Sequence, residues 1–303
     1  MPDYTEQSKY PVPCVDVLVF NEKDELLIIQ RNKEPHNGEW SIIGGRVEVS
    51  DDNIEYTALR EVKEETGFDV KLEHLVGILA QPDRVPAADP RFFIVQTVYT
   101  ARYLEGDFVI NPEVKNHAWV PLEEARKKKL AYNHNDILDL YVERKKKLIP
   151  VQRTKHEEYY GKEYIYNETN SRVRFAGNAI VLNEKNEILL ALRGQKPYVD
   201  FWDFPGGHMY VDESVDDCIT REVREELGVP CEVGELFHVY SDKGKSPRAA
   251  DVVSFYFVKI LDNHFERNIE MRDFVYFPFD KLPKEIAYHN EGPLEDIRKF
   301  LMK

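Results

Sequence analysis

Residues 207–229 read GHMYVDESVDDCITREVREELGV, and the rest of the chain can be understood from this stretch. Its apolar positions fall at helical spacing: Val215, Cys218, Ile219 and Val223. Ser214 followed three residues later by Asp217 resembles a capping box, so the spacing predicts a helix over 214–227. Glu222, Glu225 and Glu226 then share one face of that helix, within about one turn.

Three carboxylates on one helical face repel each other. Each like-charged pair destabilises an isolated helix by about 0.2–0.5 kcal/mol. A solvated acidic face is the ordinary explanation of such a run, and it would account for Glu225 and Glu226 taken alone. A divalent cation would remove the repulsion, because Mg2+ takes carboxylate oxygens together with substrate phosphate oxygens. The three glutamates therefore predict a Mg2+ site, in which Mn2+ can take the place of Mg2+.

The same stretch matches the signature G-x5-E-x7-R-E-U-x-E-E-x-G-U, with U apolar, and so it resembles the Nudix hydrolase family. A solvated acidic face does not explain Gly207, Glu213 and Gly228 at their spacings. The resemblance implies hydrolysis of a phosphoanhydride bond with Mg2+ or Mn2+. It also implies metal-site residues in this half of the chain: Gly207, Glu213, Glu222, Glu225 and Glu226.

The chain contains one domain twice. NEKDELL at 21–27 recurs as NEKNEIL at 183–189, 162 positions later, and REVKEETGF from Arg60 recurs as REVREELGV from Arg221. We expect copy one at residues 1–147, a linker at 148–171 and copy two at 172–303. Mixed strands and helices predict an α/β fold, which the family resemblance sharpens to two tandem Nudix-type α/β/α sandwiches with mixed β-sheets.

Alternating and apolar runs predict the elements of each copy. The first two strands of each copy are expected to form a hairpin, and part of the tyrosine-rich linker is expected to pack as an extra strand or a docking segment. The expected strands are 15–20, 26–30 and 93–99 in copy one, and 179–182, 188–192 and 252–258 in copy two. The expected helices are 53–66 and 135–147, then 214–227 and 293–302.

Copy one departs from the signature at one point. One residue is inserted between Gly45 and Arg60, so the position of Glu213 falls on Asp51 or Asp52, and Asp52 with Glu55 could instead serve as a helix start. Its helix face is complete, with metal-site residues Glu61, Glu64 and Glu65. We expect copy one to keep the fold and to bind metal, and we expect activity first of all in copy two.

A glutamate outside the signature is a further candidate in each copy. Glu113 and Glu270 each lie six residues before a matched aromatic position. They resemble a metal-ligating or basic glutamate of some family members, although an ordinary loop carboxylate remains an equal alternative. The expected catalytic residues are Glu61, Glu64, Glu65 and Glu113 in copy one, and Glu222, Glu225, Glu226 and Glu270 in copy two. Which of them acts as the general base stays open. Arg60 and Arg221 are expected to orient carboxylates four residues further on.

Composition narrows the functional class. The 303 residues are 42% hydrophobic and carry a net charge of −14, which argues against a nucleic-acid-binding surface, since that binding depends on Lys and Arg. The three cysteines have no metal-ligand spacing and no pairing pattern. No apolar run approaches membrane-spanning length, and the first residues hold no apolar signal core. We therefore expect a cytoplasmic protein with a nucleotide-derivative substrate and no membrane partner; a homodimer is compatible with these features.

Two segments of copy one point to a substrate. GILAQPDRVPAADPRFFIVQTVY at 77–99 and LAYNHNDIL at 130–138 resemble segments of ADP-ribose pyrophosphatases and of related regulators of NAD metabolism. The resemblance implies ADP-ribose or a nucleotide sugar as the substrate. Two alternatives remain: hydrolysis of oxidised or excess nucleoside triphosphates, and a nucleotide sensor in which one or both copies do not catalyse.

Overall fold

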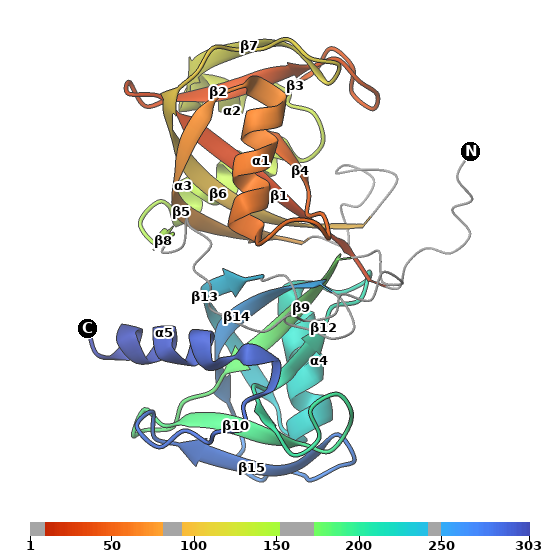
Figure 1. The fold of residues 1–303 in the computed structure, drawn as a ribbon, viewed down its shortest axis with the longest axis vertical. Coiled ribbons are helices and arrows are strands. Elements are labelled where there is room, and N and C mark those ends of the chain that lie inside the picture. The colour runs from red at the N-terminus through yellow and green to blue at the C-terminus, as the bar shows by residue number, and fades with distance from the viewer. Residues whose placement is uncertain (1–9, 81–92, 152–172, 242–249) are drawn as a thin grey trace. The chain divides into compact units, whose positions relative to one another are not determined.

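A computed structural model describes residues 10–80, 93–151, 173–241 and 250–303 (Figure 1). The chain divides into two compact units, Pro11–Glu163 and a second that comprises Met1–Tyr10 and Tyr164–Lys303. Each unit is a mixed α/β domain. The fold class predicted from the sequence is therefore correct.

Copy one is built on a single mixed sheet with the order β3-β2-β1-β6-β5-β8, while β4 also pairs with β1 and β7 with β2. Strands β1 and β6 run parallel, and the other pairs run antiparallel. The strands are β1 Val12–Phe20, β2 Glu25–Arg31, β3 Trp40–Ser41, β4 Ile43–Arg46, β5 Asp69–Leu79, β6 Ile94–Glu105, β7 Val114–Pro121 and β8 Ile149–Pro150. The helices are α1 Ile54–Thr66, α2 Leu122–Lys127 and α3 His134–Arg144.

Helices cover both faces of that sheet. Side chains of α3 such as Ile137 and Leu138 pack with Leu18 of β1 in one buried cluster. Helix α1 instead packs against β1, β4 and β5. Val17 and Val19 alternate with Leu18 along β1 and are fully buried as well, so β1 is covered on both sides.

Copy two repeats the design with two sheets, ordered β12-β9-β14-β13 and β11-β10-β15. Strands β9 and β14 run parallel, as β1 and β6 do. The strands are β9 Val173–Ile180, β10 Ile188–Arg193, β11 Trp202–Asp203, β12 Gly206–His208, β13 Cys231–Tyr240, β14 Ala250–Ile260 and β15 Met271–Phe277. The helices are α4 Val215–Leu227, the short 3-10 turn η2 Ala287–His289 and α5 Glu291–Leu301.

The hairpin expected at the start of each copy forms only at its closed end. Strands β1 and β2 pair at Phe20 and Leu26 alone, and copy two has a single bridge between Leu182 and Ile188. Beyond the turn β1 pairs with β4 and β6, while β2 pairs with β3 and β7. The hairpin prediction was therefore wrong for most of its length, because a strand buried on both faces is central and takes its neighbours from distant parts of the chain.

The two signature helices are fixed at both ends. The side chain of Ser214 accepts from the backbone N–H of Asp217, and the reciprocal bond completes the predicted capping box of α4. In copy one the cap is Asn53, whose side chain accepts from the backbone N–H of Tyr56. The alternative start from Asp52 and Glu55 was wrong, since Asn53 holds that position. Both helices end at a glycine with a left-handed backbone, Gly67 at φ 81° and Gly228 at φ 74°.

Several expectations fall on parts of the chain outside the described residues. The start of the expected linker forms β8, which pairs with β5, whereas the tyrosines at 159–166 lie outside the described ranges. Most of the segment after β5 that resembles ADP-ribose pyrophosphatases also lies outside them. None of the helices in the described residues has the length and apolar character that crossing a membrane requires.

Replacing the cap of α4 tests how this helix is held. Ser214→Ala should lower local stability by about 1 kcal/mol, because one backbone N–H loses its partner. In hydrogen–deuterium exchange of the full chain, amides of 215–227 should then exchange about fivefold faster. Ser214→Thr, which keeps the hydroxyl, is the matched control. Unchanged exchange in Ser214→Ala would show that the cap does not anchor the helix.

Candidate active site

Each copy places a pair of glycines on a short strand directly beside the signature helix. Gly44 and Gly45 lie on β4, and Gly206 and Gly207 lie on β12. A Cβ atom on Gly207 would lie 2.5 Å from Glu222 Oε1, and one on Gly45 would overlap the carboxylate of Glu61. Glycine at these positions lets the carboxylate of the helix lie directly against the strand backbone.

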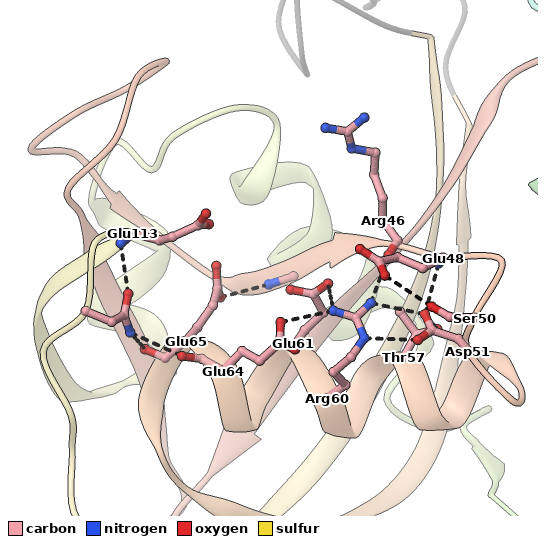
Figure 2. Close-up of polar contacts among 12 residues, drawn as sticks. Arg46, Glu48, Ser50, Asp51, Thr57, Arg60, Glu61, Glu64, Glu65 and Glu113 are labelled. Atoms are coloured by element: carbon pink, nitrogen blue, oxygen red, sulfur yellow. Dashed lines mark hydrogen bonds and ion pairs between the residues drawn. The ribbon is translucent and has the colours of Figure 1, made fainter. Parts of the chain in front are cut away.

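The three helix carboxylates of copy one lie along one face of α1 (Figure 2). Glu65 is buried, and its Oε2 accepts from the backbone N–H of Gly44 at 3.3 Å. Glu61 accepts from Arg60 Nη1 at 2.7 Å. Glu64 accepts from the same nitrogen at 3.1 Å, and its side chain is 59% exposed. The carboxylates of this face therefore differ in solvent exposure, from the buried Glu65 to the exposed Glu64.

Copy two repeats this arrangement. Glu226 is buried and accepts from the backbone N–H of Gly206 at 2.8 Å. Glu222 and Glu225 accept from Arg221 Nη1 at 2.6 and 3.1 Å. We call Glu61, Glu64 and Glu65, and likewise Glu222, Glu225 and Glu226, the carboxylate triads. The structure brings each triad together on one helix face.

The signature arginine locks the loop before the helix onto the helix. Arg221 donates from Nε to Glu213 Oε1 at 2.5 Å and from Nη2 to Glu213 Oε2 at 3.0 Å. The backbone N–H of Tyr210 also donates to Glu213, at 3.0 Å. The structure thus places Glu213, an expected metal-site residue, against Arg221 rather than within the triad. Its contacts orient the arginine that in turn holds Glu222 and Glu225.

Asp51 takes this role in copy one. Arg60 donates from Nε and Nη2 to the two oxygens of Asp51, both at 3.0 Å. Figure 2 shows Asp51 and Arg60 facing each other beside Glu61. Asp51 therefore makes the two-pronged bond to the arginine that Glu213 makes in copy two, although its side chain is one carbon shorter and the loop is one residue longer.

The buried members of the triads resist ionisation. Burial, and next the charge of Glu61, raise the pKa of Glu65 well above its usual value. Burial and the charge of Glu222 do the same to the pKa of Glu226. Burial also raises the pKa of Glu61 and of Glu222, although the neighbouring arginines oppose the shift. Each triad is therefore a place where additional positive charge would be stabilising.

The donor set fits a hard divalent cation. No three acidic, His or Cys side chains within the described ranges already converge on one point, because Glu222 faces Arg221 and Glu226 faces the backbone N–H of Gly206. All the candidate donors are oxygens on one helix face, and the glycine beside them lets a carboxylate lie against the strand. Oxygen donors of this kind suit Mg2+ and Mn2+.

The glutamates outside the signature lie beside the triads. Glu270 lines a cavity of about 400 Å3 that the triad of copy two also lines. In copy one the charge of Glu113 contributes to the raised pKa of Glu65, and Lys33 Nζ contacts Glu113 Oε1 at 2.5 Å. Gln195 stands at the position of Lys33 in copy two. The outside glutamates are therefore not remote loop residues, and they differ between the copies in their charged partner.

The signature did not predict the residues that line the far side of this cavity. Asp203 accepts there from Arg193 Nη1 and from Asn290 Nδ2, each at 2.9 Å, and burial raises the pKa of Asp203 to about 6. These residues come from β10, β11 and the start of α5, which are far apart in the sequence. The match of Arg31 to Arg193 in the repeat was the available signal.

Copy one has a different buried network in this region. Asp16 accepts from Gln96 Nε2 at 2.8 Å, and Gln96 accepts from Asn133 Nδ2 at 2.7 Å. Burial raises the pKa of Asp16 to about 7. His134 Nε2 lies 3.5 Å from Asp16, and burial lowers the pKa of His134 to about 3, so this histidine is neutral at pH 7. Gln96 lies in the segment 77–99, and Asn133 and His134 lie in 130–138, the two segments that resemble ADP-ribose pyrophosphatases, but their contacts with Asp16 were not predicted.

Comparison with known proteins gives one family for both copies. A profile of the NUDIX domain matches residues 11–141 and 173–297. The chain is similar to the ADP-ribose pyrophosphatase of Methanocaldococcus jannaschii, with 31% identity over 134 residues, 44% of this chain and 74% of that protein. It is also similar to the ADPR responsive transcriptional repressor NtrR of Acinetobacter baylyi, with 31% identity over 44% of this chain and 54% of that protein.

Further similarities cover smaller shares. NAD-capped RNA hydrolase NudC of Escherichia coli O157:H7 is 31% identical over 34% of this chain and 37% of its own length. Among solved structures, the NUDIX domain of Shewanella oneidensis NrtR complexed with ADP ribose matches with a TM-score of 0.40 and 25% identity, over 45% of this chain and 90% of that one. The chain thus spans about half of the repressor and just over a third of the RNA hydrolase.

The close contact at Gly45 is testable. Gly45→Ala should weaken Mn2+ binding to copy one about tenfold or more, because the added methyl displaces the carboxylate of Glu61. Electron paramagnetic resonance of Mn2+ would measure it in a chain whose copy two carries Glu222→Gln and Glu226→Gln. Gly77→Ala is the control, since a methyl there meets nothing closer than 3.4 Å. Equal binding by the two variants would contradict this role for the glycine.

The buried Asp16 predicts a pH-dependent stability. Burial raises the pKa of Asp16 from 3.8 to about 7, so the folded state keeps a proton on Asp16 at pH values where the unfolded state has released it. The stabilisation that this bound proton gives is lost as the pH rises through 7. Asp16→Asn should therefore stabilise copy one by a margin that grows by ~2–3 kcal/mol between pH 5 and pH 8. Urea unfolding followed by hydrogen exchange of peptides from 12–20 would measure it. Asp139→Asn, at an exposed site, should show no such trend.

Proposed function

We propose that this chain, which belongs to the NUDIX family and acts on phosphoanhydride bonds, hydrolyses ADP-ribose or a similar nucleotide sugar with Mg2+. The products would be a nucleoside monophosphate and a phosphorylated remainder. The single observation that carries the proposal is the carboxylate triad of copy two, which lines one cavity together with Glu270. The similarity to an ADP-ribose pyrophosphatase supports this choice of substrate.

Each residue of the proposed site has its own role in the reaction. A bound Mg2+ ion would neutralise the phosphate oxygens and favour attack by water at phosphorus. The triad would hold the ion, and Arg221, held by Glu213, would keep Glu222 and Glu225 in place. We propose that Glu270 accepts the proton of the attacking water, since it lines the cavity and lies outside the helix whose carboxylates would hold the ion. The bond from phosphorus to the bridging oxygen breaks as the new bond to water oxygen forms.

A second candidate function applies to copy one. There Lys33 forms an ion pair with Glu113, whereas the matched position in copy two is Gln195. The lysine occupies one oxygen of the carboxylate that matches the proposed base of copy two, which favours ligand binding without turnover. The similarity to a repressor that responds to ADPR is in line with such a sensor role. Copy one would then bind the nucleotide that copy two hydrolyses.

The organisation proposed for the whole chain follows from the repeat. Residues 1–147 and 172–303 would form two separate sites, joined by the segment 148–171. The hydrolysis of nucleoside triphosphates remains the alternative for either site. We retain the cytoplasm as the proposed location and a homodimer as an arrangement to be tested by the mass of the protein in solution.

Single-copy variants test the function. Glu226→Gln should lower Mg2+-dependent release of AMP from ADP-ribose by about 100-fold or more, because it removes a carboxylate from the only triad expected to turn over. Glu65→Gln should leave most of the activity if copy one is a sensor. Glu123→Gln and Glu295→Gln, which change surface carboxylates of copy one and copy two, are the controls.

The opposite outcomes are informative. Equal losses in the two variants would show that both copies catalyse. Full activity in the double variant Glu65→Gln/Glu226→Gln would exclude the triads as the catalytic metal sites. Release of pyrophosphate from nucleoside triphosphates, without cleavage of ADP-ribose, would replace the proposed substrate.

A further inference from the structure

The candidate site of each copy lies over the same face of the sheet, which we call the floor. Strand pairing sets the floor residues in rows across neighbouring strands, and each row of copy two can be matched with a row of copy one. In copy two, Arg174 on β9 pairs with Asp251 on β14, and Ala176 pairs with both Val253 and His208. In copy one the equivalent register pairs Val12 with Ile94, and Cys14 with both Gln96 and Arg46. Strand register fixes which residues share a face, so these correspondences do not depend on sequence alignment.

In copy two the outer end of this floor is charged. Arg174 Nε donates to Asp251 Oδ1 at 3.2 Å, and His208 Nε2 lies 3.2 Å from the same oxygen. All three residues line the 400 Å3 cavity with the carboxylate triad. His208 also lies close enough to Glu222 for its charge to lower the pKa of that glutamate. The cluster of Arg174, His208 and Asp251, which we call the outer cluster, therefore adjoins the candidate metal site.

In copy one the row that matches Arg174 and Asp251 is apolar. Val12 and Ile94 stand where Arg174 and Asp251 stand in copy two. Arg46 takes the place of His208, and Figure 2 shows its side chain pointing away from α1. A buried polar pair of the copy-one floor, Asp16 and Gln96, lies deeper instead. The two sites thus share a triad and differ in what surrounds it.

We propose that the outer cluster is a phosphate-binding subsite, through which copy two prefers substrates that carry a phosphate group in addition to the pyrophosphate being cleaved. The inference rests on the proposed function, since it concerns the specificity of the same site. Copy one, with Val12 and Ile94 in that place, favours substrates whose remainder carries no further phosphate there. The two copies therefore differ in their preference between nucleotides with and without this additional phosphate.

The geometry of the outer cluster suits this role. The bond from Arg174 to Asp251 uses Nε, and no hydrogen bond within the described residues engages its Nη groups. These can therefore donate to a phosphate, the anion that a guanidinium binds with two parallel hydrogen bonds. Asp251 holds Arg174 and His208 side by side, so less side-chain freedom is lost when a ligand binds. Lys196 also lines the cavity, whereas the matched residue of copy one is Glu34. Copy two therefore has a positive side chain where copy one has a negative one, and the positive charge favours binding of an anion.

The test uses the full chain with one copy disabled at a time. In Glu65→Gln, which leaves copy two, Arg174→Val should lower the ratio of kcat/KM for the phosphorylated over the unphosphorylated substrate about tenfold or more. ADP-ribose 2′-phosphate and ATP are compared in turn with ADP-ribose, which distinguishes a ribose phosphate from a terminal phosphate. Arg174→Lys, which keeps the charge, should restore part of the ratio. In Glu226→Gln, which leaves copy one, Arg174→Val should change nothing.

A binding measurement separates this proposal from the proposed function. Tripolyphosphate titrated calorimetrically into the double variant Glu65→Gln/Glu226→Gln should bind about tenfold more weakly once Arg174→Val is added. An unchanged dissociation constant, or an unchanged substrate ratio in Glu65→Gln once Arg174→Val is added, would overturn the phosphate subsite even if hydrolysis occurs. Absence of all hydrolysis, with the expected loss of tripolyphosphate binding, would overturn the proposed function and leave the subsite standing.

Discussion

The structure depends on holding several carboxylates close together with a single arginine as their counter-charge. In each copy a glycine strand lies so close to the signature helix that a glutamate carboxylate contacts its backbone. One glutamate accepts a hydrogen bond from a backbone N–H of that strand, while an arginine donates hydrogen bonds to the other two. The arginine is held in turn by an acidic residue of the preceding loop. The fixed glycine, arginine and acidic residues of the signature thus keep repelling groups within reach of one another.

Around this shared arrangement the two copies have diverged in side chains but not in backbone register. The parallel pair β1 and β6 aligns its residues as β9 and β14 do. Buried polar groups have moved between positions: Asp16 of copy one stands where copy two has Asn178, and Asp203 of copy two stands where copy one has Ser41. A scaffold that keeps its register while exchanging such groups can change its ligand without altering the helix that carries the chemistry.

Much of this could be predicted from the sequence, since the signature fixes local spacing and the repeat fixes the architecture. The capping box at Ser214 and the face shared by Glu222, Glu225 and Glu226 follow from helical periodicity alone. The pairing of β1 could not be predicted, because β4 and β6 come from distant segments. The networks at Asp16 and Asp203 were missed for the same reason: their members meet only after folding. Local sequence did not reveal that Asp51, rather than Asp52, faces Arg60.

The contact of Asp51 with Arg60 limits how the two halves can exchange parts. In copy one a longer loop accompanies a shorter acidic side chain, and in copy two a shorter loop accompanies a longer one. Either change made alone would leave the arginine without its two-pronged partner and free to swing over the neighbouring glutamates. The length of the loop and the choice between Asp and Glu must therefore change together. Recombination between the halves can preserve the site only when the whole segment from the glycine to the arginine is transferred.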